Sequence, residues 1–139
     1  MESVSSDPAM SEFLLDTDVI IWHLRGRQDV TRALSELQAS GVPSCSALSV
    51  LEVHVGLKKG EEEKTNLFLG SLIVIAVSKM IAERAAMEIR EQRAQGITID
   101  IPDAIIAATC LAHNLTLVTY NKRHYPFEDL SFHPLPLLR

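Results

Sequence analysis

Short apolar runs alternate with longer helical segments along almost the whole chain, and this alternation restricts the possible fold more than any other feature. Strands separated by helices predict an α/β fold, because each helix returns the chain to begin a neighbouring parallel strand. We therefore expect a single domain with a parallel β-sheet of four to five strands flanked by helices. The expected strands are FLLD (13–16), VPSCS (42–46), LIVIAV (72–77), LTLVTY (115–120) and an edge strand SFHPL (131–135).

The segments between these runs carry helix start and stop signals. Ser46 or Ser49 is suited to cap the helix that follows the second strand. Glycine or asparagine closes several of the others, as is common where a helix ends. The expected helices lie in segments 19–26, 29–40, 47–60, 61–71, 78–96 and 101–114.

Composition limits the class of protein. The chain has 139 residues, of which 47% are hydrophobic, so it can bury a substantial core. A net charge of −5 argues against a protein that coats nucleic acid by bulk attraction, but it allows a local basic rim. We expect residues 1–11 to form a flexible tail and residues 12–139 to form the domain.

The cysteines and the longest apolar run indicate the compartment. Cys45 and Cys110 lie far apart in apolar surroundings, which favours buried free thiols in a reducing cytosol over a disulfide. The longest apolar run, 67–77, is too short to span a membrane and is interrupted by Gly70 and Ser71. We therefore expect a cytoplasmic protein without a membrane segment.

Two acids, Asp16 and Asp18, interrupt the apolar stretch EFLLDTDVIIWHL (12–24). An unpaired carboxylate beside a buried strand costs on the order of several kcal/mol, so its presence needs a reason. Open α/β sheets bind ligands at the carboxyl ends of their strands, and Asp16 lies there. The alternative is that an acid caps the next helix. The spacing allows Asp18 that role and leaves Asp16 unexplained.

Two further acids lie on apolar helices. Glu52 is surrounded by valine and leucine; the alternative to a functional role is a narrow solvent-facing stripe shared with Ser49 and Gly56. Asp103 lies in the first turn of its helix, where the helix dipole favours an anion. Asp100, three residues earlier, is a candidate cap for the same helix.

Thr119 and Asn121 lie at the end of a buried strand, at the same sheet edge as Asp16. Ordinary turn chemistry would also explain the asparagine. Taken together, polar groups at two strand ends and on two apolar helices suggest one pocket. Clustered carboxylates repel one another unless a cation joins them, and oxygen ligands suit Mg²⁺ or Mn²⁺. Such a site activates water and stabilises in-line displacement at phosphorus.

Three segments, LLDTDVIIWHL, SALSVLEVHVGL and IPDAIIAATCLAHNLTLVTYNKRHY, resemble in order and spacing the motifs of PIN-domain ribonucleases. The resemblance is strongest to VapC-type toxins of bacterial toxin–antitoxin pairs and runs from Phe13 to about Phe132. It implies a PIN-like parallel sheet flanked by helices and a Mg²⁺ or Mn²⁺ site that cleaves RNA by metal-activated water. It also implies a homodimer and an antitoxin protein that blocks the site.

Carried over by position, Asp16 matches the first acid of the family, Glu52 the second and Asp103 the third. The resemblance therefore implies that these three are the catalytic residues and the metal ligands. If they share a pocket, their like charges repel. Replacing Asp16 with Asn is then expected to be neutral or stabilising in the absence of metal.

The family often has a fourth acid where this chain reads TYNKRHY. Asn121 and His124 stand there instead, which leaves a second metal ion without an obvious ligand. Asp100 and Asp18 are the candidates to compensate. Thr119 matches a small hydroxyl residue that is common in the family, and is expected to contact a water or the metal shell.

Basic residues near these motifs are candidates for a phosphate-binding rim, although each could equally be ordinary solvated surface charge. They are Arg25, Lys58, Lys59, Lys122 and Arg123.

Two other functions are open to the same residues. The DTD sequence resembles the D-x-D start of haloacid-dehalogenase-type phosphatases, in which Asp16 would be a nucleophile and Asp18 a general acid. That reading gives Glu52 no role. The other alternative is a degenerate PIN fold that binds RNA or a protein partner without catalysis, which the missing fourth acid leaves open.

Surface apolar residues are the expected partner contacts. We expect Trp22 and residues 67–69 to be exposed on their helices, where they would pair two copies or receive an antitoxin. The acidic pocket should attract a basic side chain of that antitoxin, most favourably an arginine, which can bind a carboxylate in a bidentate manner.

Overall fold

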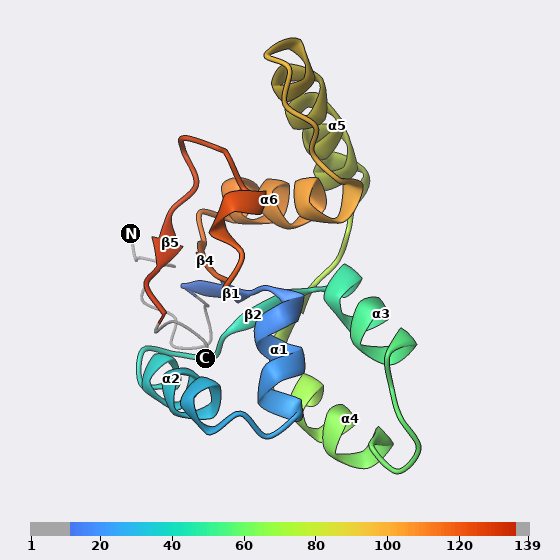
Figure 1. Cartoon of the computed structure of the whole chain (residues 1–139), viewed down its shortest axis with the longest axis vertical. Coiled ribbons are helices and arrows are strands. Elements are labelled where there is room, and N and C mark those ends of the chain that lie inside the picture. Colours follow the sequence, from blue (N-terminus) through green and yellow to red (C-terminus); the bar gives the residue numbers. More distant parts are fainter. Residues whose placement is uncertain (1–11, 136–139) are drawn as a thin grey trace, which may run out of the picture.

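The computed structural model describes residues 12–135, which form a five-stranded parallel sheet with helices on both faces (Figure 1). The strand order is β3-β2-β1-β4-β5, so β1 lies at the centre, and Leu15 is opposite Val118 on β4. The parallel sheet predicted from the alternation of strands and helices is confirmed, including the short edge strand. The strands are β1 (Phe13–Leu15), β2 (Ser44–Ser46), β3 (Ile73–Ile75), β4 (Thr116–Val118) and β5 (Phe132–His133).

The helices begin and end close to the expected signals. Ser46, rather than Ser49, caps the helix after β2 by accepting a hydrogen bond from Leu48 N at 3.0 Å. Gly26 follows the first helix with φ +86°, and Asn114 ends the last with φ 56°. The helices are α1 (Thr17–Leu24), α2 (Gln28–Gln38), α3 (Ala47–Val55), α4 (Glu62–Gly70), α5 (Lys79–Ala94) and α6 (Ile101–His113), with a 3₁₀ turn η2 (Lys122–His124) after β4.

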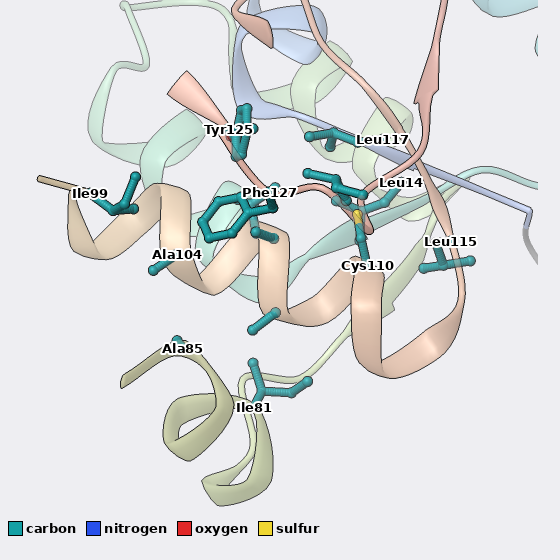
Figure 2. Close-up of a cluster of buried hydrophobic side chains, with 14 residues drawn as sticks. Leu14, Ile81, Ala85, Ile99, Ala104, Cys110, Leu115, Leu117, Tyr125 and Phe127 are labelled. Atoms are coloured by element: carbon teal, nitrogen blue, oxygen red, sulfur yellow. The ribbon is translucent and has the colours of Figure 1, made fainter. Parts of the chain in front are cut away.

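The sheet separates two hydrophobic cores, because successive side chains of a strand point to opposite faces. Leu14 and Leu117 pack on one face with α5, α6 and the segment after η2 (Figure 2). Leu15 and Val118 pack on the other face with α1, α2, α3 and α4. The central strands are therefore buried on both faces. A polar side chain of these strands can reach a ligand only at a strand end.

Cys45 and Cys110 are both buried and free, which confirms the expectation of free thiols. Within residues 12–135, no helix has the length and apolar character needed to cross a membrane. The predicted tail 1–11 and the last four residues of the predicted domain lie outside the described residues, so that division of the chain stays a prediction.

The expected apolar surface on α1 and α4 is only partly found. Trp22 is 39% exposed and Leu67 is 71% exposed, but Leu69 is buried. Successive helix positions are rotated by about 100°, so Leu69 lies on the same face as buried Thr65, four residues earlier, and not beside Leu67. The prediction of a continuous exposed run over 67–69 is therefore wrong at Leu69.

Candidate active site

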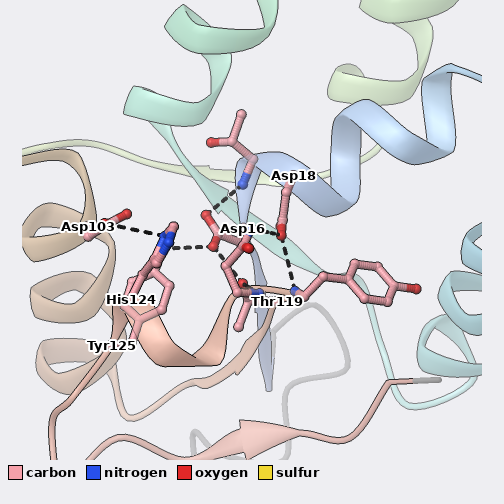
Figure 3. A network of polar contacts seen from close by, with 9 residues as sticks. Asp16, Asp18, Asp103, Thr119, His124 and Tyr125 are labelled. Carbon is pink, nitrogen blue, oxygen red and sulfur yellow. Dashed lines mark hydrogen bonds and ion pairs between the residues drawn. The ribbon is translucent and has the colours of Figure 1, made fainter. Parts of the chain in front are cut away.

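Asp16 lies directly after β1, at the N-cap of α1 (Figure 3). Its backbone N–H donates to Val118 O at 2.9 Å, so the pairing of β1 with β4 fixes its position. The side chain is 8% exposed and accepts three hydrogen bonds, each of 2.8 Å. Thr17 N donates to Oδ1, and the hydroxyls of Thr119 and Tyr125 both donate to Oδ2. These donors offset the cost of burying a carboxylate.

The capping alternative is correct for one of the two acids, but the acid is Asp16 and not Asp18. Helix α1 begins at Thr17, two residues earlier than a cap at Asp18 would require. A cap needs only a bond to the first turn of its own helix. The donors Thr119 and Tyr125 lie 103 and 109 residues away in the sequence. The fold therefore holds the Asp16 carboxylate from two sides, and capping explains only one of them.

Asp18 joins the first turn of α1 to the loop after β4. Its Oδ2 accepts hydrogen bonds from Tyr120 N at 3.1 Å and from Asn121 Nδ2 at 2.7 Å. Among the described residues, its Oδ1 is buried without a hydrogen-bond partner. Burial, followed by the negative charge of Asp16, raises the pKa of Asp18 to about 6. Asp18 thus holds Asn121 beside the site, and its pKa depends on the charge of Asp16.

Glu52 is connected to Asp16 through Thr17. The Thr17 hydroxyl donates to Glu52 Oε1 at 2.6 Å and lies 2.8 Å from Ser49 Oγ. Ser49 is fully buried, so the alternative of a solvent-facing stripe on α3 is wrong at Ser49, although Gly56 is exposed and Glu52 is half-buried. Because the Thr17 backbone binds Asp16 and its side chain binds Glu52, one residue sets the position of two acids.

Asp103 and Glu52 line one open hollow of about 620 Å³, to which Asp100 and His124 also contribute. Asp103 comes from the first turn of α6, and Glu52 comes from α3. Burial raises the pKa of Asp103, and the negative charge of Asp16 raises it further. A protonated His124, whose Nδ1 lies 3.8 Å from Asp103 Oδ2, opposes this effect. The charge of Asp16 therefore acts on the carboxylate of Asp103, although the two residues belong to separate elements.

Asp100 occupies the N-cap position of α6 but makes no side-chain capping hydrogen bond, so the expected cap is not found. Of the expected basic rim, Arg123 lines a second hollow of about 170 Å³ together with Asp100 and Asp103. Arg25 instead lies 4.0 Å from Glu61. Arg123 is therefore a residue of the expected rim that lies beside these acids, together with His124.

The donor set suits a divalent cation, although the acids do not converge on one point. Within residues 12–135, no three His, Cys, Asp or Glu side chains form a ready group for an ion. Mg²⁺ usually keeps several waters and needs only one or two carboxylates from the protein, so a closed group is not required. Asp16 Oδ1 accepts a single hydrogen bond, and Asp18 Oδ1 accepts none. These oxygens retain lone pairs, and the residues fit an oxygen-preferring ion.

Two parts of the site have no signal in the local sequence pattern. Tyr125 lies between the expected strands 115–120 and 131–135, yet its hydroxyl reaches Asp16. Burial, and then the charge of Asp16, raises the pKa of Tyr125 above its usual range. Thr17 lies between the candidate acids Asp16 and Asp18, yet it is Thr17 that contacts Glu52. Each is only a hydroxyl side chain close in sequence to a candidate residue, Asp16 for Thr17 and Asn121 for Tyr125.

The sequence matches the PIN domain family over residues 13–132, and the chain belongs to that family. Within it, the chain belongs with the VapC-type proteins, because it is 34% identical to Ribonuclease VapC10 of Mycobacterium tuberculosis over 85% of this chain and 90% of that protein. It is 32% identical to Ribonuclease VapC19 of the same species, with 85% and 96% covered. A toxin–antitoxin complex from Klebsiella pneumoniae superposes with a TM-score of 0.71 at 32% identity, covering 84% of this chain and 92% of that one.

Family membership confirms the resemblance seen in the three motifs and contradicts the phosphatase alternative. A PIN domain extends over nearly the whole described chain. Asp18, which would have to be the general acid of a D-x-D phosphatase, is instead hydrogen bonded to the backbone and side chain of the loop after β4.

Proposed function

We propose that this PIN-domain protein is a Mg²⁺- or Mn²⁺-dependent endoribonuclease and the toxin of a type II toxin–antitoxin pair. The observation that carries the proposal is the buried Asp16 carboxylate, held by donors from α1 and from the segment after β4. Its charge also raises the pKa values of two neighbouring acids. The relatives named above are ribonucleases, and the Klebsiella structure is a toxin–antitoxin complex, which supports the same conclusion.

In this proposal Asp16, Glu52 and Asp103 are the catalytic acids and hold the ion. A bound divalent ion supplies Lewis acidity toward a phosphoryl oxygen and makes water a better nucleophile. The supporting residues are Asp18, Asp100, Thr119 and Asn121.

The chain's own residues orient the acids and the substrate. Thr17 turns Glu52 through their 2.6 Å hydrogen bond, and Thr119 holds Asp16 Oδ2. Arg123, in the hollow beside Asp103, is placed to bind a backbone phosphate, which fixes the register of the RNA without reading its sequence. Hydrolysis then joins the water oxygen to phosphorus and breaks one P–O bond, and the leaving oxygen takes up a proton.

The proposed partners follow from charge and exposed apolar area. The hollow between α3 and α6 is lined by three acids, Glu52, Asp100 and Asp103, so an arginine of the antitoxin would bind there and exclude RNA. Leu51 and Val55 are 58% and 80% exposed on one face of α3, which supports a homodimer. We place the protein in the cytoplasm, where an RNA substrate is present and buried thiols stay reduced.

The test is cleavage of a defined RNA by purified protein with Mg²⁺, with Mn²⁺ and with excess EDTA. We expect cleavage with either ion and none with EDTA. Equal cleavage in EDTA would exclude the metal-dependent mechanism. A protein that neither cuts RNA nor binds Mn²⁺ would instead be a non-catalytic binding module. That alternative stays open because Asn121 stands in the segment where the family often has a fourth acid.

A further inference from the structure

Tyr125, the last residue of the third motif, places a hydroxyl group inside the site, although the motif gave this residue no role. The residue follows η2 and is 3% exposed, and its ring packs 6.5 Å from that of Phe132. Its hydroxyl is 2.8 Å from Asp16 Oδ2, and Figure 3 shows it approaching from the side of Asp103 and His124. A tyrosine hydroxyl is protonated at neutral pH, so it donates to the carboxylate.

The bond from Tyr125 determines which oxygen of Asp16 remains available. A carboxylate oxygen has two lone pairs. Oδ2 accepts from both Thr119 and Tyr125, whereas Oδ1 accepts only from Thr17 N. With both Oδ2 lone pairs occupied, Oδ1 is the oxygen left to contact an ion. The two hydroxyls also prevent the carboxylate from rotating about its terminal bond.

We propose that Tyr125 is a positioning residue that holds the Asp16 carboxylate so that Oδ1 meets the divalent ion. This inference rests on the proposed function, because it assumes that Asp16 is a ligand. Groups that hydrogen bond to metal-ligating side chains typically change metal affinity or activity by about 10–100-fold when removed. Without the Tyr125 hydroxyl, the Asp16 carboxylate would be less restrained. Binding of the ion would then have to order this carboxylate, which weakens the binding.

The protein contains a matched control for this test. It has two tyrosines, Tyr120 and Tyr125. Among the described residues, the Tyr120 hydroxyl has no hydrogen-bond partner. Tyr125→Phe and Tyr120→Phe therefore remove the same group from the same loop, but only the first removal affects Asp16. The backbone N–H of Tyr120, which donates to Asp18, is kept in both variants.

The readout is Mn²⁺ binding without RNA, followed by electron paramagnetic resonance, with a thermal melt of each metal-free protein. We expect Tyr125→Phe to weaken Mn²⁺ binding by about tenfold or more, and Tyr120→Phe to bind like the wild type. A Tyr125→Phe protein that melts earlier but binds Mn²⁺ within twofold of the wild type would show a merely structural residue and overturn the inference. Failure of the wild type itself to bind Mn²⁺ would overturn the proposed function as well.

A second measurement does not depend on Tyr125→Phe being folded. In the Tyr120→Phe protein, 3-fluorotyrosine incorporation labels Tyr125 alone and gives one fluorine resonance. We expect this resonance to shift when Mg²⁺ is added, because the ion and the hydroxyl share the same carboxylate. A resonance that stays unchanged at Mg²⁺ concentrations that saturate the protein would overturn the inference about Tyr125. Binding of Mn²⁺ to the wild type would still support the proposed function.

Discussion

Replacing Asp16 with Asn removes one charge from the site and, in the structure, also two acceptor positions. The amide oxygen of asparagine can still accept the capping bond from Thr17 N, but the amide NH₂ cannot accept from Thr119 and Tyr125. Hydrogen bonds to charged groups contribute about 1.5–3 kcal/mol each. Relief of the repulsion with Asp18 offsets only part of this loss. We therefore expect a destabilisation of about 1–3 kcal/mol without metal, where repulsion alone predicts a neutral or stabilising effect.

The assay combines urea unfolding, thermal melts with and without Mn²⁺, and RNA cleavage. Mn²⁺ should raise the melting temperature of the wild type, since it binds only the folded state, and should do much less for Asp16→Asn. Cleavage by the variant should fall on the order of a hundredfold or more. Asp29→Asn is the matched control, because Asp29 is only partly buried, on α2, and lies 3.0 Å from Arg27. An Asp16→Asn protein with full cleavage and the full Mn²⁺ shift would remove Asp16 from the site.

Three further perturbations test separate parts of the structure. Burial raises the pKa of Asp18 from 3.8 to about 6, so the folded state binds more protons than the unfolded chain in this range. The free energy of unfolding of the protein should then fall by up to about 3 kcal/mol as pH rises from about 4 to above 6. Urea melts of Asp18→Asn should lack this fall. Thr17→Val removes the hydroxyl that contacts Glu52 and should slow cleavage about tenfold while leaving the melting temperature nearly unchanged; unaltered cleavage would count against a role for that contact. Light scattering should show a dimer that Leu51→Glu shifts toward monomer, and a monomeric wild type at every concentration would exclude the dimer.

The arrangement of strands and helices was predictable because its signals are local. Ser78 accepts a capping bond from Ile81 N, and Asn114 adopts the left-handed conformation that ends α6. Both residue types favour these positions for reasons of their own geometry. The apolar strands could be recognised since both faces of the sheet are covered. The rotation of α4 that buries Leu69 was also open to prediction from the helical period.

The contacts inside the site were less predictable, because they join side chains that are distant in the sequence. Thr17 and Glu52 are 35 residues apart, and Tyr125 and Asp16 are 109 apart. Parallel pairing predicts that strand ends meet, and so it indicates that Asp16 and Thr119 are close. It does not specify which way a tyrosine in the following loop turns. A local pattern also could not show that Asp16 would be both the helix cap and the partner of two hydroxyls.

The bonds from Thr119 and Tyr125 to Asp16 have a consequence for a chain that is still being synthesised. β1 is translated early, but both of the residues that hold Oδ2 are translated more than 100 positions later. Until β4 pairs with β1 and η2 folds behind it, the Asp16 carboxylate lacks these donors, and Asp103 has no fixed place beside it. A nascent chain therefore carries the acids without the arrangement that would let them act together. Under the proposed function, a nascent chain that has not yet folded through Tyr125 therefore has no competent nuclease site.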